Sequence, residues 1–138
     1  MQPTKPPTAN PSEPQNRGRA IPCVEDERFI SELYVRALTK AGYTVTVEPD
    51  GKKALDLART NKFDIILLDL MVPTMTGIDI LRNLRGAGQK PIKSKIVITT
   101  NLEQREEIRA DIEKQADAYL VKAEITPKEL VLFLDTIK

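Results

Sequence analysis

The sequence predicts an α/β protein built on a doubly wound, open parallel sheet of five strands with helices on both faces. From Ala20 onward, short apolar runs alternate with amphipathic stretches five times in succession. The run at 65–68 consists of four large aliphatic residues, as expected for a strand that is buried on both faces. Regular alternation of strands and helices favours parallel strands whose connecting helices cover both faces of the sheet.

Each element of this alternation has its own support. Strands are expected at 20–24, 43–47, 63–69, 95–99 and 117–121, and helices at 28–41, 51–60, 76–86, 102–114 and 126–137. In the first helix, apolar residues recur at helical spacing, and Gly42 is a natural stop. The last helix opens with Thr-Pro-Lys-Glu at 126–129, which combines an N-cap, a first-turn proline and the glutamate of a capping box. Thr-Gly-Ile-Asp at 76–79 is a weaker version of the same start.

Length and composition restrict the class of protein. The 138 residues suit one domain with a sizeable core. A net charge of +1 provides no electrostatic basis for bulk binding to nucleic acid or membranes. No run approaches the roughly 18 to 20 apolar residues of a membrane span, and the first residues lack the hydrophobic core of a secretory signal. We therefore expect a cytoplasmic protein that contacts neither membrane nor nucleic acid directly.

The first 19 residues differ from the rest of the chain. Residues 1–19 hold five of the ten prolines and contain no Val, Ile, Leu or Phe. Such a segment cannot bury enough apolar surface to order itself, so we expect a disordered, proline-rich tail followed by one domain at 20–138. Its PxxP spacings could also serve a proline-binding module, but a solvated tail is the favoured interpretation.

Cysteine and histidine usage excludes several chemistries. The one cysteine, Cys23, excludes an intrachain disulfide framework and a multi-cysteine zinc site, and its place in an apolar strand favours a buried filler over a reactive thiol. The chain has no histidine. It therefore lacks the usual general base, the usual zinc ligand and any Ser-His or Cys-His nucleophile, and it cannot carry a phosphohistidine itself.

Polar residues follow the predicted strands where each strand ends. The first strand runs into Glu25, Asp26 and Glu27, and the third ends in Asp69. In open α/β sheets, ligands bind beyond the carboxyl ends of the strands. The fourth and fifth strands bring a hydroxyl, Thr99, and an ammonium, Lys122, to the same edge. An acidic cluster of this kind is costly unless a cation lies in it, which indicates a functional site.

This set of residues suits phosphoryl transfer. Carboxylates that retain water are the ligands that Mg²⁺ prefers. Asp69 can act as the nucleophile, Lys122 can supply positive charge to a phosphoryl group, and Thr99 can donate a hydrogen bond. The product would be an aspartyl phosphate. Simpler interpretations remain open for each residue alone: Asp69 could cap a turn, the acids at 25–27 could be a solvated helix start, Lys122 a surface lysine, and Tyr119 ordinary core.

Over about residues 20–138, these motifs together resemble the receiver domain of two-component response regulators. The segments that carry the resemblance are Val24–Glu27, Asp69–Gly77, Ile96–Thr99 and Ala116–Lys122. The resemblance implies a flavodoxin-like sheet with strand order 2-1-3-4-5. It also implies that Asp69 accepts a phosphoryl group from a sensor histidine kinase or a histidine phosphotransfer protein, so that the chain is a phosphorelay component and not a conventional enzyme, limited to self-catalysed phosphoacceptance and autodephosphorylation.

The resemblance also assigns roles to the other residues. Glu25, Asp26, Asp69 and the Met71 backbone carbonyl would hold Mg²⁺, or Mn²⁺ in its place. Thr99 and Lys122 would contact the phosphoryl oxygens. Thr99 and Tyr119 would act as the switch, which couples the site to the face formed by the fourth helix, fifth strand and fifth helix. That face would bind a downstream protein, or a second copy of the chain on phosphorylation.

The chain departs from the family pattern at four positions. Ala123 replaces the usual proline after Lys122, so we expect a trans peptide bond and a rearranged loop. Gln115 replaces a helix-ending glycine, and Thr100 replaces a small residue beside the switch hydroxyl. Pro22 removes one donor from an interior strand, for which we expect a shift or bulge.

In the receiver family that the chain resembles, the positions of Met71 and Asn101 would flank the path of attacking water, and we expect them to tune the phosphoryl lifetime. The favoured interpretation is a stand-alone, single-domain receiver. The main alternative is a pseudo-receiver that binds partners without phosphorylation, kept open by Ala123 and Thr100. A haloacid-dehalogenase-like phosphatase would need an aspartate where Met71 stands. A flavodoxin is disfavoured because acids 25–27 would repel a phosphate.

Overall fold

The structure is a computed structural model that describes residues 19–101 and 106–137. Strands and helices alternate along these residues as β1 (Ala20–Val24), α1 (Arg28–Lys40), β2 (Thr44–Glu48), α2 (Gly51–Arg59), β3 (Ile65–Asp69), α3 (Gly77–Arg85), β4 (Lys95–Thr100), α4 (Glu106–Gln115), β5 (Ala118–Val121), the 3-10 helix η1 (Lys122–Glu124) and α5 (Pro127–Leu134). Of the predicted tail, only Arg19 is described, and 102–105 of the predicted fourth helix also lie outside the described residues.

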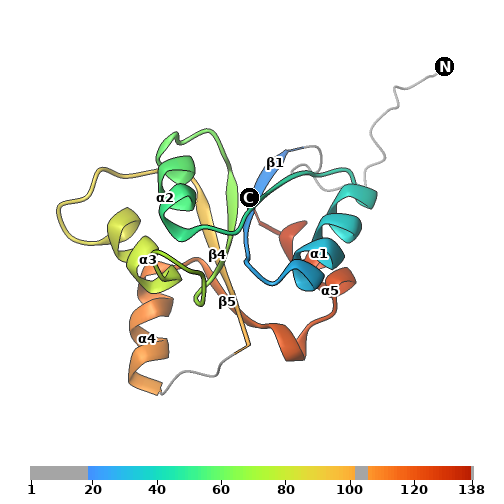
Figure 1. Cartoon of the computed structure of the whole chain (residues 1–138). Helices are drawn as coiled ribbons and strands as arrows, with labels where there is room; N and C mark the ends of the chain where they lie inside the picture. The colour runs from blue at the N-terminus through green and yellow to red at the C-terminus, as the bar shows by residue number, and fades with distance from the viewer. Residues whose placement is uncertain (1–18, 102–105, 138) are drawn as a thin grey trace.

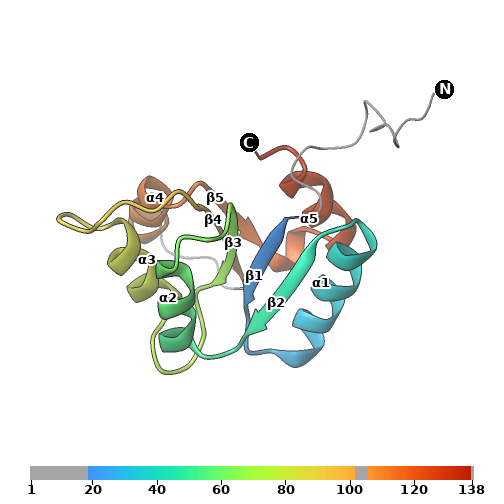
Figure 2. The same cartoon turned by 90° about the horizontal axis from the view of Figure 1, so that it is seen from above.

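The five strands form one parallel sheet in the order β2-β1-β3-β4-β5, which confirms the predicted fold. α1 and α5 cover one face of the sheet, and α2, α3 and α4 cover the other (Figures 1 and 2). The register places Asp69 opposite Thr99 and Val24 opposite Leu68. The carboxyl ends of β1, β3 and β4 therefore meet at one edge.

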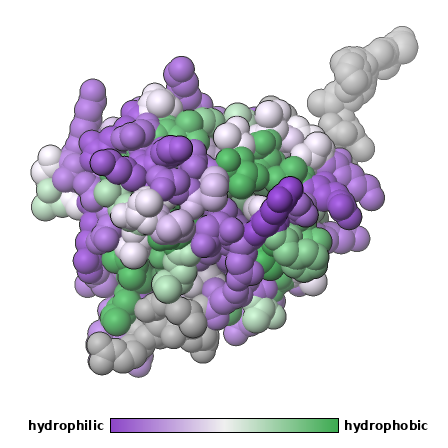
Figure 3. Space-filling view, viewed as in Figure 1, coloured by the Kyte–Doolittle hydropathy of each residue, from purple (hydrophilic) through white to green (hydrophobic). Residues whose placement is uncertain are grey.

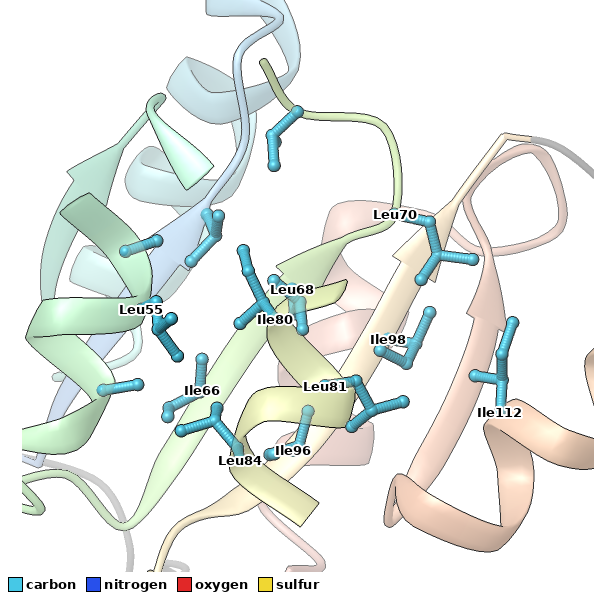
Figure 4. Close-up of a cluster of buried hydrophobic side chains, with 14 residues drawn as sticks. Leu55, Ile66, Leu68, Leu70, Ile80, Leu81, Leu84, Ile96, Ile98 and Ile112 are labelled. Carbon is cyan, nitrogen blue, oxygen red and sulfur yellow. The ribbon is translucent and has the colours of Figure 1, made fainter. Parts of the chain in front are cut away.

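The aliphatic run in β3 is solid because both faces of the sheet are covered. Ile66 and Leu68 pack toward α2, α3 and α4, where Figure 4 shows them among side chains of α3 and β4. Ile65 and Leu67 point the other way, into the cluster formed with α1 and α5. All four are at most 2% exposed. Successive side chains of a strand alternate between faces, so a strand buried on both sides needs an apolar residue at every position.

The predicted helix ends are confirmed where a specific motif marks them. α1 ends in a Schellman motif: the Tyr43 N–H donates to the Leu38 carbonyl, the Gly42 N–H donates to the Thr39 carbonyl, and Gly42 has a φ of 104°. At α5, the Glu129 N–H donates to Thr126 Oγ1 at 3.1 Å, and the Thr126 N–H donates to Glu129 Oε1 at 2.9 Å. These two bonds form the predicted capping box.

The departures from the family pattern have structural outcomes. β1 pairs with β2 in unbroken register from Ala20 through Pro22 to Val24, so the bulge expected at Pro22 does not occur in that pairing. The described pairing of β1 with β3 begins only at Cys23, after the missing donor of Pro22. Every described peptide bond is trans, and the residues after β5 form the short turn η1, which no sequence pattern predicted. Among the described non-glycine residues, only Asn61 and Thr74 have a positive φ. Gln115 therefore does not adopt the left-handed conformation of the glycine that it replaces.

Polar residues cover most of the face shown in Figure 3, where hydrophobic residues gather in small separate patches. The large apolar side chains that are exposed in the described part of the chain are Phe29, Val47, Met71 and Leu132. Over the same residues, no helix is long and apolar enough to cross a membrane.

Replacing Thr126 by alanine should lower the free energy of unfolding by about 1 kcal/mol, because the substitution removes the N-cap acceptor of α5. Urea denaturation followed by circular dichroism measures the change. Thr126→Ser keeps the hydroxyl and should unfold close to wild type. Equal losses for Ala and Ser would show that the cap hydrogen bond is not the cause.

Replacing Gly77 by alanine should cost about 3 kcal/mol, because an added Cβ would lie 2.3 Å from the Asp69 carbonyl oxygen and 2.6 Å from Leu70 Cα. Gly88 is the matched control. Its φ of 82° is unfavourable for alanine, but no heavy atom of another segment lies within 4 Å of its Cβ position. Gly88→Ala should therefore cost only about 1 kcal/mol. A larger loss for Gly88→Ala than for Gly77→Ala in urea denaturation would show that close backbone approach is not what requires glycine at Gly77.

Candidate functional site

Four strand ends deliver the predicted site residues to one edge of the sheet. Glu25 follows β1, Asp69 ends β3, Thr99 lies in β4 opposite Asp69, and Lys122 follows β5 as the first residue of η1. All four are buried, with exposures of 2%, 4%, 3% and 9% in that order. The structure therefore brings together side chains that the sequence placed only on separate strands.

The Lys122 ammonium lies between two buried carboxylates. Its Nζ donates to Glu25 Oε1 and, at 2.9 Å, to Asp69 Oδ2. The three side chains are each 6% exposed or less. This geometry excludes the interpretation of Lys122 as a solvated surface lysine. It also leaves two carboxylates sharing one cation.

Burial and mutual contact shift the pKa values of Glu25 and Lys122. Burial raises the pKa of the Glu25 carboxyl above its usual value, and the Asp69 charge adds to that rise, while the hydrogen bond from Lys122 opposes it. Burial alone would lower the pKa of the Lys122 ammonium, but its contacts with Glu25 and Asp69 outweigh burial and raise that pKa. Lys122 thus stays charged at neutral pH.

Backbone N–H groups hold the second oxygen of each carboxylate. Asp69 Oδ1 accepts from the Met71 N–H, and Glu25 Oε2 accepts from the Glu27 N–H, each at 3.1 Å. Asp69 therefore does cap the turn after its strand, but with one oxygen only. Glu27 is the N-cap of α1, and its side chain makes no cap hydrogen bond. Asp26 and Glu27 are exposed, as in a solvated helix start, whereas Glu25 is buried.

Glu25, Asp26 and Asp69 offer carboxylate oxygens that all lie within 4.8 Å of one another. Asp26 is exposed, whereas the other two are buried, so the group opens to solvent on one side. An all-oxygen set of this kind fits a hard divalent cation such as Mg²⁺ or Mn²⁺, which keeps part of its water shell.

The remaining predicted residues surround this cluster. Met71 is 56% exposed, and Asn101 is also exposed just after β4. Tyr119 pairs with Ile98 and packs on the α2–α4 side of the sheet, so it does not join the acidic cluster. The Arg109 guanidinium lies 4.5 Å from the centre of the Tyr119 ring, a cation–π contact between α4 and β5. Thr100 is fully buried, beside the Thr99 hydroxyl in sequence.

Cys23 lies in β1, two residues before Glu25, and its thiol is buried. Its side chain is 1% exposed, and burial, reinforced by the Glu25 charge, raises the pKa of its thiol to about 12. A thiol that stays protonated at neutral pH is a poor nucleophile, which agrees with the predicted role as a buried filler.

The residues that support the loop after Asp69 were missed in the sequence. The Gly51 N–H donates to the Pro73 carbonyl, and the Gly77 N–H donates to the Leu70 carbonyl, both at 2.9 Å. Asp50 accepts from the Lys53 N–H and caps α2. The Asp-Gly pair before a helical pattern could have predicted the cap. The contact of Gly51 with the loop at 70–76 had no sequence signature, because the partners are distant in the chain.

Comparison with known proteins identifies this arrangement. A family model for the response regulator receiver domain matches residues 21–135. Response regulator ArlR of Staphylococcus epidermidis is 38% identical over 99 residues, which cover 72% of this chain and 43% of ArlR. ArlR of Staphylococcus aureus is 36% identical over the same length. The matched region thus spans less than half of these curated relatives.

Solved structures agree. The receiver domain of Francisella response regulator 1452 has a TM-score of 0.74 and 28% identity, covering 86% of this chain and 95% of that one. The BeF3-activated N-terminal receiver domain of Klebsiella pneumoniae RstA has a TM-score of 0.71 and 31% identity, covering 86% and 97%. By its sequence, its strand order and the residues at the carboxyl edge of its sheet, the chain belongs to the family of response regulator receiver domains.

Proposed function

We propose that this receiver accepts a phosphoryl group on Asp69 in a Mg²⁺-dependent reaction, with a sensor histidine kinase or a histidine phosphotransfer protein as donor. The observation that carries the proposal is the buried Asp69 carboxylate, bonded to Lys122 on one side and adjoining the acids Glu25 and Asp26 on the other. Because the 138 residues contain no histidine, the phosphohistidine must come from outside them.

In the proposed reaction, an Asp69 carboxylate oxygen attacks the phosphorus of the phosphohistidine. The new O–P bond forms as the P–N bond breaks, and the bonding electron pair leaves with the donor imidazole. The Met71 N–H holds one Asp69 oxygen and so orients the carboxylate. A divalent cation held by Glu25, Asp26, Asp69 and the Met71 carbonyl would neutralise phosphoryl charge, and Lys122 and Thr99 would contact the other phosphoryl oxygens.

Signal would leave through the face formed by α4, β5 and α5. Thr99 lies beside Asp69, and Tyr119 lies one strand further, on the opposite face of the sheet. Movement of Thr99 toward a phosphoryl group would reach Tyr119 through the paired backbones of β4 and β5 and would alter its contact with Arg109. A downstream protein, or a second copy of the chain, would then bind the altered face. Exposed Met71 and Asn101 would set the rate at which water hydrolyses the aspartyl phosphate.

A phosphorylation-independent pseudo-receiver is the second candidate, and one observation favours it. Lys122 already bonds both buried carboxylates, so the chain has an internal counter-ion for the site. Relatives favour an activatable site, since the RstA receiver domain has a BeF3-activated form. The phosphatase alternative has less support, because Met71 stands where that class needs an aspartate.

Treatment with Mg²⁺ and acetyl phosphate should add one phosphoryl group to the wild type and none to Asp69→Asn, as read by intact mass spectrometry. Asp64→Asn is the matched control, since Asp64 lies at the opposite end of the same strand in surface ion pairs with Arg19 and Lys93. An adduct on Asp69→Asn would place the acceptor elsewhere. No adduct and no donor hydrolysis in the wild type would favour the pseudo-receiver. Rapid hydrolysis without an adduct would favour a phosphatase or a very short-lived aspartyl phosphate.

Replacing Lys122 by methionine should lower the free energy of unfolding by about 3 kcal/mol in EDTA, because two buried carboxylates lose their common cation. Mg²⁺ should recover part of that loss, since a divalent ion can take over the role of counter-ion. Urea denaturation with and without Mg²⁺ measures both effects. The exposed Lys128→Met serves as control and should show neither. A loss in Lys122→Met that is insensitive to Mg²⁺ would contradict a metal site at these carboxylates.

A further inference from the structure

Thr74, in the loop between β3 and α3, has a backbone conformation that its side chain disfavours. Its φ is 70°, in the left-handed region, where a β-branched residue is a genuine outlier. Thr74 is exposed, so core packing does not force this conformation. Strain of this kind persists only where surrounding contacts hold it, and the contacts of Thr74 are therefore informative.

The Thr74 hydroxyl binds the first turn of α2. Thr74 Oγ1 accepts a hydrogen bond from the Lys52 N–H at 3.1 Å. The same hydroxyl interacts with the carboxylate of Asp50, whose pKa is lowered first by the Lys53 N–H and then by Thr74. The N–H groups at a helix start lack partners within the helix, so a loop hydroxyl that accepts from one of them acts as a cap supplied from outside.

A second contact beside Thr74 fixes the same loop to the same helix. The Gly51 N–H donates to the Pro73 carbonyl at 2.9 Å. Gly51 has no room for a side chain, because a Cβ there would lie 1.8 Å from the Met75 carbonyl oxygen. Two of the first three N–H groups of α2 are thus used by the loop at 70–76.

This contact joins the two sides of the acidic cluster. The loop begins directly after Asp69, and its Met71 N–H holds Asp69 Oδ1. On the other side, the Asp50 N–H donates to Glu48 Oε2 at 3.1 Å, and the Glu25 N–H donates to the Glu48 carbonyl at 3.3 Å. A chain of contacts therefore runs from the acid pair after β1, through the turn after β2, to the loop after β3.

We infer that Thr74 is a positioning residue for this site, whose hydroxyl fastens the loop at 70–76 to the first turn of α2 and so sets Met71 and Asp69 relative to the acid pair at Glu25 and Asp26. The inference rests on the proposed function, because it assumes that these groups bind Mg²⁺. Glycine at this position would relieve the backbone strain but would lose the hydroxyl.

Three variants of the full chain separate the hydroxyl from the strain. Thr74→Val keeps the shape and the strain but loses the hydroxyl, Thr74→Gly loses both, and Thr74→Ser keeps the hydroxyl. Thr60→Val is the matched control, since the Thr60 hydroxyl donates to the Leu57 carbonyl at the far end of α2. Amide hydrogen exchange at Lys52 reports the contact itself, and calorimetric titration with MgCl2 reports the site.

We expect faster exchange at Lys52 and a Mg²⁺ affinity that is lower by about three- to tenfold in Thr74→Val and Thr74→Gly, as the loss of one hydrogen bond predicts. Thr74→Ser and Thr60→Val should keep the wild-type affinity. Glycine should unfold at higher urea than valine, so an equal loss of Mg²⁺ affinity in the two variants cannot come from lost stability.

Three results would overturn the inference in different ways. Unchanged Mg²⁺ affinity in Thr74→Val and Thr74→Gly, with a wild type that binds Mg²⁺, overturns the positioning role and leaves the proposed function standing. A loss in Thr74→Ser equal to that in Thr74→Val overturns the role of the hydroxyl. A wild type that binds no Mg²⁺ overturns the proposed function, and the positioning role with it.

Discussion

The arrangement of side chains at the carboxyl end of this sheet depends on the contact of one ammonium with two buried carboxylates. Lys122 bonds Glu25 and Asp69 where water is almost excluded, and a buried charge without a partner would be costly. One cation cannot balance two anions, so the site stays electrostatically incomplete. Lys122 offsets part of the buried negative charge, and the residual charge is what the proposed binding of a divalent ion would neutralise.

Close backbone approaches hold this cluster in place. The loop after Asp69 contacts α2 at Gly51 and the start of α3 at Gly77, two positions where a side chain would collide with backbone atoms. Backbone N–H groups then orient both carboxylates through one oxygen each, which leaves the other oxygens to face Lys122. Precision at the site thus depends on glycines and hydrogen bonds in loops, while the apolar clusters on the two faces keep the strand ends at a common edge.

The face formed by α4, β5 and α5 has a different chemistry. Tyr119 lies across the sheet from Asp69, half-buried against the α2–α4 cluster and stacked by Arg109, whose Nε also donates to Glu113 Oε1 at 2.7 Å. The contact between α4 and β5 is therefore polar and partly exposed. Such a contact can rearrange at lower cost than a close-packed apolar interface, which is compatible with the switch role proposed for this face.

Local patterns in the chain were enough to predict the sheet, its parallel strands and the edge at which Glu25, Asp26, Asp69, Thr99 and Lys122 meet, because solid apolar runs and helical periodicity are local properties. Helix ends were predictable where a local motif marks them, as at Gly42 and Thr126. The pairing of charges, by contrast, is a tertiary property: Lys122 and Glu25 are 97 residues apart, and Lys122 is the first residue of η1, which no local pattern indicated. The left-handed Thr74 and its bond to Lys52 were equally hidden, because their geometry arises from two loops that meet only in the folded chain.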